Sequence, residues 1–179
     1  MEKRYPKRMI LKVSKLGTKV LRQKSREVDV KNIARGAYEP FLESLLHTMR
    51  EYEGTGIAAP QVFTGLKIFL YEVDPERRNK KEKAVPPTAL FNARYEPVGD
   101  EIEVEAEGCL SVPFLWGEEV PRFRKIRVRA IDRKGKPVDF EAEGFHARVL
   151  QHEIDHLEGL VYLDRMKDLK SLHYTVNFG

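Results

Sequence analysis

The segment Gln151-His152-Glu153-Ile154-Asp155-His156 is the feature that most constrains what this chain can fold into. It contains the H-E-x-x-H pattern, in which two imidazoles lie four residues apart and a carboxylate follows the first. Four residues turn through roughly 400° on an α-helix, so His152 and His156 share one face about 6 Å apart along the axis. The pattern therefore predicts a helix that carries two ligands for one metal ion.

Glu153 gives this histidine pair a chemical use. Its side chain projects to the side of the helix, where it can reach a water molecule on a cation held by His152 and His156. A divalent metal lowers the pKa of such a water from about 15.7 toward 7, and a nearby carboxylate can pass its proton to a leaving group. The alternative is a partly buried polar pair or a solvated helix face, but Glu153 and the apolar neighbours Val149 and Leu150 favour a metal. We therefore expect hydrolysis.

A catalytic zinc-type site typically has three protein ligands and one open position, so a third donor is needed. The residues after the helix are poor candidates. Tyr162 stands where a metzincin has its third histidine. Asp164 and Asp168 come too early for a carboxylate from a second helix, and they lie in a basic stretch. The third ligand is therefore expected upstream.

Cys109 is the outstanding upstream donor and the only cysteine of the chain. A lone cysteine is commonly a small buried apolar side chain. Here it lies in Glu107-Gly108-Cys109-Leu110-Ser111-Val112-Pro113, where the glycine permits close backbone approach and an apolar run that can be a strand follows. A thiolate with two imidazoles suits Zn, Fe(II), Co or Ni, and ligand type does not choose among them.

A third segment, Gly54-Thr55-Gly56-Ile57-Ala58-Ala59-Pro60-Gln61, is rich in small residues. Such a run fits where another chain's backbone lies close. Without a third spaced glycine or a following Gly-Lys-Ser/Thr, it is weak evidence for a nucleotide site. An isolated loop of this kind is usually structural. Beside a metal site it is suited to binding an extended peptide, with Gln61 donating to a carbonyl oxygen.

Together the three segments resemble the peptide deformylase family. Residues 54–61 fit its G-x-G-x-A-A-P-Q motif, residues 107–111 fit E-G-C-L-S, and residues 151–159 fit Q-H-E-x-D-H-L-x-G. Three ungapped motifs in the family's order are far more specific than H-E-x-x-H alone. The resemblance implies an enzyme that removes the formyl group from the N-terminal methionine of nascent chains and releases formate.

The resemblance also implies roles for individual residues. The three metal ligands would be Cys109, His152 and His156. Glu153 would be the general acid and base, while the Gln61 amide and the Leu110 backbone N–H would stabilise the oxyanion, since donors must point at its developing charge. Members of this family are similar in using one divalent ion, Fe(II) in the cell, commonly replaced by Ni, Co or Zn in preparations.

For the substrate, the resemblance implies that Gly56, Ile57 and Gly108 offer backbone groups to the peptide. A methionine side chain also needs an apolar slot near the metal, and four side chains are expected to line one cavity: Thr55, Ile57, Phe145 and Val149. Many family members have glycine soon after E-G-C-L-S-x-P, whereas this chain has Phe114-Leu115-Trp116 before Gly117. The rim of the substrate groove is therefore expected to differ.

Length and charge fit one catalytic domain over residues 1–179. The chain has 32 Lys and Arg against 28 Asp and Glu, a net charge of +4. The positive residues gather near the N-terminus (Lys3, Arg4, Lys7, Arg8, Lys12 and Lys15) and at 122–136. These groups form either a solvated face, which we favour, or a weak patch for RNA that would serve transient ribosome association without sequence-specific nucleic-acid binding.

Apolar runs of about 18 residues and a secretory signal are both lacking, so we expect no membrane span. The expected location is the cytoplasm, or an organelle matrix if a presequence has been removed. An H-E-x-x-H protease and a basic RNA- or ribosome-binding module remain the alternative functions.

The remaining pattern predicts an α+β fold, with antiparallel strands in small sheets around the C-terminal metal helix. Helices are expected from Pro40 toward Tyr52 and at 145–158, the second ended by Gly159. Strands are expected at 66–72 and 88–96, with a hairpin of 125–131 and 136–143 and a charged exposed loop at 74–83. At 101–106 we expect a strand whose glutamates face water. We also expect Glu107 to pair with Arg122.

Overall fold

The computed structural model describes residues 9–77 and 83–175, and within them the chain has an α+β fold built on two antiparallel sheets. The larger sheet has the order β1-β2-β3-β6-β7 and the smaller one the order β4-β5-β8. The strands of the larger sheet are β1 Gly56–Ala58, β2 Ile68–Val73, β3 Val85–Pro97, β6 Lys125–Ile131 and β7 Pro137–Glu143. Those of the smaller sheet are β4 Ile102–Cys109, β5 Val112–Phe123 and β8 Leu172–Tyr174.

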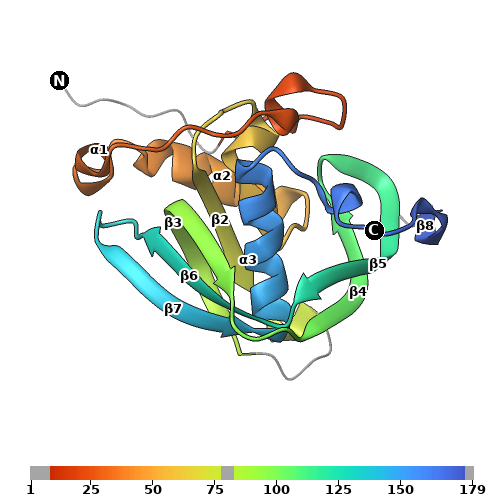
Figure 1. Cartoon of the computed structure of the whole chain (residues 1–179). Helices are drawn as coiled ribbons and strands as arrows, with labels where there is room; N and C mark the ends of the chain where they lie inside the picture. The colour runs from red at the N-terminus through yellow and green to blue at the C-terminus, as the bar shows by residue number, and fades with distance from the viewer. Residues whose placement is uncertain (1–8, 78–82, 176–179) are drawn as a thin grey trace.

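Three α-helices accompany the sheets in the described part of the chain: α1 Val30–Ala34, α2 Glu39–Glu51 and α3 Gly144–Leu157. Helix α3 lies between the larger sheet and the β4–β5 hairpin, and α2 lies on the far side of the larger sheet (Figure 1). Short 3-10 helices connect these elements at Lys19–Arg22, Ala59–Val62, Pro75–Arg77, Tyr162–Asp164 and Leu169–Ser171. The C-terminal helix is therefore the centre of the molecule, as the sequence predicts.

Strand β2 explains how both faces of the larger sheet are covered. Phe69 and Tyr71 belong to the cluster that packs on α3, while Ile68 and Leu70 belong to the cluster that packs on α2. Successive side chains of a strand point to opposite faces, so a strand buried on both sides needs a continuous apolar run. The sequence of β2 has such a run, and all four of these side chains are buried.

The predicted helices and the hairpin are confirmed within one or two residues. Helices α2 and α3 begin one residue before the predicted starts, and Gly159, at φ 81°, follows the end of α3. In the hairpin, β6 pairs with β7 from Lys125↔Glu143 to Ile131↔Pro137. The predicted loop at 74–83 is described only in part, since residues 78–82 lie outside the described residues.

The predicted orientation of strand 101–106 is wrong. Ile102 and Val104 are 45% and 56% exposed, whereas the glutamates of β4 point toward the protein, and Glu107 is 6% exposed. The reason is a pair of arginines on that side. Arg148 of α3 pairs with Glu105 and Glu107, and Arg122 of β5 pairs with Glu107, so the glutamate face is the less exposed one. Only Glu107 is buried, since the side chains of Glu103 and Glu105 are 34% and 33% exposed.

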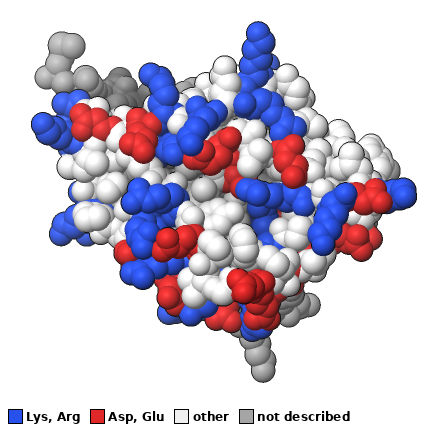
Figure 2. Space-filling view, viewed as in Figure 1, with Lys and Arg blue, Asp and Glu red and all other residues white. Residues whose placement is uncertain are grey.

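The basic group at 122–136 forms an ion-paired surface. Four arginines of this stretch each form an ion pair with a carboxylate: Arg124 with Glu101, Arg127 with Asp139, Arg129 with Glu96 and Arg133 with Glu39. Figure 2 shows Lys and Arg mixed with Asp and Glu over the face in view. This arrangement fits the solvated face expected from the sequence. Lys3, Arg4, Lys7 and Arg8 lie outside the described residues.

No helix within residues 9–77 and 83–175 is long and apolar enough to cross a bilayer.

Candidate metal centre and active site

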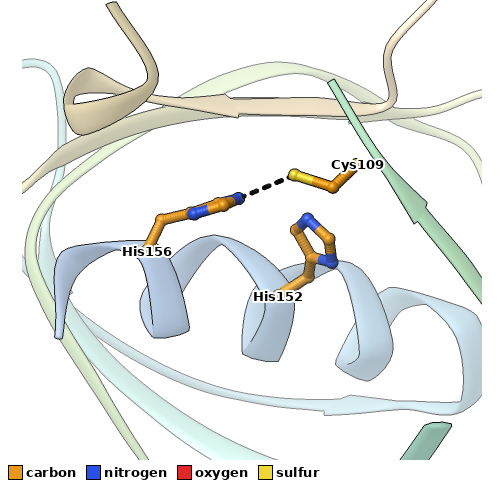
Figure 3. Close-up of side chains that lie close together, drawn as sticks. All are labelled: Cys109, His152 and His156. Carbon is orange, nitrogen blue, oxygen red and sulfur yellow. Dashed lines mark hydrogen bonds between the residues drawn. The ribbon is translucent and has the colours of Figure 1, made fainter. Parts of the chain in front are cut away.

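The three predicted metal ligands lie together. Cys109 is the last residue of β4, and His152 and His156 lie on successive turns of α3 (Figure 3). One ligand atom from each of the three residues lies within 4.8 Å of the other two. Cys109 Sγ is 3.3 Å from His156 Nε2, although the two residues are 47 positions apart in the chain. A thiol and two imidazoles meeting at this distance could hold one metal ion.

The charges at this centre favour the thiolate form of Cys109. Burial alone would raise the pKa of the Cys109 thiol, but the charge of His156 and hydrogen bonds from both histidines hold that pKa well below its ordinary value. Burial alone would lower the pKa of His152, yet hydrogen bonds to Cys109 and Glu107 raise it well above its ordinary value. The thiolate is the form of cysteine that binds metals. Cys109 is therefore suited to ligation.

Glu107 orients His152. Its Oε2 lies 2.9 Å from His152 Nδ1, which leaves the other ring nitrogen of His152 facing Cys109 (Figure 3). Such a partner fixes the ring orientation of a ligating histidine. Arg122 donates from Nε and Nη2 to the two oxygens of Glu107 at 2.8 and 2.9 Å, so the predicted Glu107–Arg122 pair is confirmed.

The ion pairs around Glu107 extend further than the sequence suggested. Arg148 Nη1 donates to Glu107 Oε1 at 2.7 Å, and Arg122 Nη1 donates to Asp155 Oδ2 at 2.5 Å. Arg165 closes this network, with Nε donating to Asp155 Oδ2 at 2.9 Å. We call Glu107, Arg122, Arg148, Asp155 and Arg165 the buried ion network, in which Arg165 is the partly exposed member, with 37% of its side chain exposed. Burial alone would raise the pKa of Glu107, but the hydrogen bonds from Arg122 and His152 outweigh it and hold that pKa well below its ordinary value.

Sequence reasoning missed Arg148, Asp155 and Arg165. One usable indication was present, because Arg148 lies four residues before His152 and Asp155 three residues after it. Side chains at these spacings share a helix face. Charged residues on the same face as a metal ligand are candidates for its partners. Arg165 follows the helix in an irregular segment and carried no comparable pattern.

Glu153 lies against the glycine-rich segment. A Cβ added to Gly56 would come within 2.3 Å of Glu153 Oε1, so any other residue at position 56 would displace the carboxylate. Glu153 is 3% exposed, and burial raises its pKa to about 7, although the charges of His152 and His156 act in the opposite direction. A carboxylate with this pKa can both accept and release a proton near neutral pH.

Two buried polar atoms of the site, Glu153 Oε2 and His156 Nδ1, have no hydrogen-bond partner among the residues that the structure describes. Buried polar groups normally have partners, so a group without one calls for an explanation such as a bound ion or water. The unpartnered Glu153 oxygen therefore fits a water on a bound metal, and the thiol and two imidazoles fit the metal itself.

Gln61 directs its amide toward the same centre. Its Oε1 accepts from the Ala58 N–H at 2.8 Å, which turns Nε2 toward Cys109 Sγ at 3.5 Å and Ser111 Oγ at 3.3 Å. Leu110 follows Cys109 at the turn between β4 and β5, so its backbone is next to the metal centre. The Gln61 amide and the Leu110 backbone therefore both lie beside Cys109.

The expected pocket residues do not all meet. Phe145 and Val149 belong to the apolar cluster on the α3 side, whereas Ile57, at 0% exposure, belongs to the cluster on the α2 side. Ile57 pairs with Leu70 of β2, which belongs to the same cluster, so the strand register places the Ile57 side chain on the α2 side of the sheet. The prediction that the side chains of Thr55, Ile57, Phe145 and Val149 line one cavity is therefore wrong for Ile57. Thr55 is half-buried at the start of the segment.

Gly108 lies against an aromatic ring. A Cβ at Gly108 would come within 2.9 Å of the Trp116 ring, which itself is 43% exposed. Phe114 is 44% exposed and has a left-handed backbone, at φ 69°. The surface beside Cys109 therefore carries two exposed aromatic side chains, Phe114 and Trp116.

An α+β fold that presents an H-E-x-x-H helix and a strand cysteine to one centre defines a class of protein, the metal-dependent hydrolases. The family model of polypeptide deformylase matches residues 10–172. The chain belongs to the peptide deformylase family. Enzymes of this family are metal-dependent hydrolases that remove the formyl group from the N-terminal methionine of nascent polypeptides, and membership implies a catalytic divalent metal.

Individual proteins agree with the family model. The chain is 38% identical over 167 residues to peptide deformylase 1 of Nitrosomonas europaea, covering 93% of each. It is 45% identical over 134 residues to peptide deformylase 1 of Bordetella pertussis, covering 75% of this chain and 76% of that protein.

Solved structures give the same result for the fold. The class I type b peptide deformylase of Acinetobacter baumannii with bound Met-Ala-Ser superposes with a TM-score of 0.83 at 29% identity, covering 89% of this chain and 99% of that one. The peptide deformylase of Thermus thermophilus gives a TM-score of 0.76 at 35% identity, covering 91% of this chain and 89% of that one.

Proposed function

We propose that this chain releases formate from formylmethionyl nascent peptides at the centre formed by Cys109, His152, His156 and Glu153. The observation that carries the proposal is the meeting of a strand cysteine with two helix histidines beside a buried carboxylate. Such a meeting of donors distant in the sequence has no evident use in stability alone, because it concentrates polar groups inside an apolar core.

In this proposal Cys109, His152 and His156 hold one divalent ion, Fe(II) in the cell and Zn, Ni or Co in some preparations. When bound, such an ion polarises a carbonyl and lowers the pKa of a coordinated water from about 15.7 toward 7. The part of the protein is to hold the three donors in place. Glu107 contributes to this by accepting a hydrogen bond from His152.

Glu153 moves the proton. Its carboxylate takes a proton from the attacking water and gives it to the methionine nitrogen as the formyl C–N bond breaks, so that formate and a free amine leave. The raised pKa of Glu153, about 7, suits both halves of this transfer. Gly56 keeps room for the carboxylate beside the reacting carbon.

Gln61 Nε2 and the Leu110 backbone N–H stabilise the oxygen of the formyl group as it gains charge. Gln61 is 1% exposed and is oriented by its bond from Ala58, so its donor is fixed before the substrate arrives. Removing one donor of this kind typically costs about 10²–10³-fold in kcat.

The substrate peptide runs past Gly56, Ile57 and Gly108, which offer backbone groups. Thr55, Phe145 and Val149 are proposed to contact the methionine side chain, with Ile57 taking part through its backbone. Burial of a side chain of that size contributes roughly 1.5–3 kcal/mol. The Met-Ala-Ser peptide bound to the Acinetobacter baumannii enzyme supports a peptide ligand in this fold.

The whole chain, residues 1–179, is proposed to act as one catalytic domain in the cytoplasm, or in an organelle matrix if a presequence has been removed. Transient association with the ribosome would bring it to its substrates. The ion-paired surface of β6 and β7 gives no support to sequence-specific nucleic-acid binding. We propose no membrane partner.

One assay tests this function. Metal-loaded protein is offered a formyl-Met peptide, an unformylated peptide and RNA, with the Glu153→Gln variant as the control. Formate release by the wild-type chain alone supports the proposal. Cleavage of an internal peptide bond would indicate an H-E-x-x-H protease, and salt-sensitive RNA binding without turnover would indicate an RNA- or ribosome-binding module.

A further inference from the structure

Residues 13–16, here called the N-terminal strap, run past both loops that carry the proposed oxyanion donors. The strap lies outside the helices and strands. Nevertheless Val13 and Ser14 are 5% and 0% exposed, which is unusual for an irregular segment near a chain end. Because the strap belongs to no helix or strand, the burial of Val13 and Ser14 must come from the contacts that the strap makes with other segments.

One end of the strap holds the Gln61 loop. The Ser14 N–H donates to the Gln61 carbonyl at 2.7 Å, and Ser14 Oγ donates to the Pro60 carbonyl at 3.0 Å. Two successive carbonyls of this loop are thus fixed by one residue. The backbone that carries the Gln61 side chain is held in place from outside the glycine-rich segment.

The other end of the strap holds the loop after Cys109. Lys15 Nζ donates to the Leu110 carbonyl at 2.8 Å, and the Leu16 N–H donates to the Ser111 carbonyl at 2.8 Å. Again two successive carbonyls are fixed. The peptide group that lies between Leu110 and Ser111 directly follows the one that carries the Leu110 N–H.

These two loops come from different sheets. The Gln61 loop continues from β1, whereas Leu110 and Ser111 join β4 to β5. The chain passes between the sheets after β3 and before β6, at the end of β4 opposite Cys109, and a third time from β7 through α3 to β8. At about 3.3 Å per residue, β4 places the metal centre more than about 20 Å from the first two of these links. The relative position of the two donors therefore depends on contacts made at the site.

Both the backbone carbonyl and the ammonium group of Lys15 have partners besides the Leu110 loop. Thr18 donates from N and Oγ1 to the Lys15 carbonyl, at 3.0 and 2.6 Å, in a turn that uses Gly17 at φ 96°. The ammonium of Lys15 lies 5.8 Å from the centre of the Tyr52 ring. A lysine restrained in this way can act as a fixed donor, and a hydrogen bond from an ionised donor is roughly twice as strong as a neutral one.

We propose that Lys15 is a positioning residue for the reaction, which holds the Leu110 loop at the correct distance from Gln61. This inference rests on the proposed roles of Gln61 and Leu110 as oxyanion donors. Lys15 acts through the Leu110 carbonyl and does not touch the substrate. A misplacement of about 1 Å can cost about 10²-fold in rate, so loss of this bond should affect the chemical step.

The test compares Lys15→Met, Lys15→Arg and Lys12→Met. Methionine keeps the length of the side chain without a donor, and arginine keeps a charged donor. Lys12 directly precedes the strap and is exposed, as Lys15 is. We expect Lys15→Met to lower kcat for a formyl-Met peptide about 10-fold with KM and metal content unchanged. Lys15→Arg should recover most of the loss, and Lys12→Met should match the wild type.

A second measurement does not depend on activity. Hydrogen–deuterium exchange over residues 107–112 should become faster in Lys15→Met than in Lys12→Met, because the Leu110 loop has lost a restraint. The same exchange rate in both variants, or a kcat within about two-fold of the wild type, would overturn the inference. So would a raised KM at unchanged kcat, or a lowered thermal midpoint with no recovery in Lys15→Arg. The exchange comparison can be made even if the wild-type chain releases no formate. Failure of the proposed function can therefore be distinguished from failure of the inference about Lys15.

Discussion

Arginine–carboxylate pairs occur in two very different settings in this molecule. In the buried ion network, the side chains of Arg122 and Glu107 are 2% and 5% exposed, whereas those of Arg127 and Asp139 on the β6–β7 hairpin are 47% and 41% exposed. Both pairs have good geometry. Only the first adjoins a proposed metal ligand, through His152.

The difference teaches what each kind of pair is for. Exposed pairs are screened by water and contribute little to stability. Buried pairs cost desolvation when they form, so they are weak evidence for stability, but removing one partner leaves a buried charge and is strongly destabilising. The buried ion network is therefore better understood as a means of orienting His152 than as a source of folding free energy.

The largest effects are expected at the centre that the network supports. Cys109→Ala should lose metal and activity together, because two imidazoles alone hold a divalent ion weakly. Glu153→Gln should keep its metal, since the three donors are untouched, and lose about 10²–10⁴-fold in kcat. Metal content measured beside formate release distinguishes them. A metal-free Glu153→Gln protein would make Glu153 a ligand or a structural residue, and near-normal turnover would require another base.

The next effect is expected inside the network. Glu107→Gln removes the charge that Arg122 and Arg148 share and should lower the free energy of unfolding by about 3 kcal/mol. It should also weaken metal affinity by about 10–100-fold, because His152 loses its charged partner. Urea unfolding and metal titration give the two values. If unfolding changes while metal affinity does not, the network stabilises the fold without orienting the ligand.

The pH dependence of stability gives a third test. The pKa of Glu107 is lowered in the folded state, chiefly through hydrogen bonds from Arg122 and His152 that outweigh burial. Its contribution is therefore fully present above the unfolded pKa, about 4.3, and is lost as pH falls through the folded value. The metal-free wild-type chain should thus lose stability below about pH 4 more steeply than Glu107→Gln. Urea midpoints measured from neutral pH down through this range test the expectation, and parallel curves would contradict the pairing as the cause.

Much of the site could be predicted because its chemistry is local in the sequence. His152 and His156 need only the period of a helix to share a face, and Gly159 marks its end. The fold class could be predicted for the same reason, because side chains repeat with a different period along a helix than along a strand. The Glu107–Arg122 pair was also accessible, because Arg122 lies on the returning strand β5, although the register sets it opposite Glu103.

The remaining features depend on contacts between distant segments. The alternation of apolar residues and glutamates in β4 correctly predicted two different faces of the strand. Which face turns toward the protein depends on Arg148, which is forty-one residues away from Glu107 in the chain. Ile57 was assigned to the pocket from its motif, whereas strand pairing turns it to the other side of the sheet. The N-terminal strap has no periodicity at all. Its role follows only from the carbonyls that lie beside it.

The smallest effect is expected at the exposed pair, which serves as the matched control for Glu107→Gln. Asp139→Asn removes the same charge from a carboxylate that also accepts three arginine hydrogen bonds, two from Arg127 and one from Arg129 Nε. Because water surrounds this pair, the shift in urea midpoint should be about a tenth of that in Glu107→Gln, and kcat, KM and metal affinity should not change. High salt should reduce even that shift, since exposed charges are screened. If Asp139→Asn instead destabilised the chain as much as Glu107→Gln, burial would not be what separates the two regions, and the orienting role of the buried network would have to be supported by metal affinity alone.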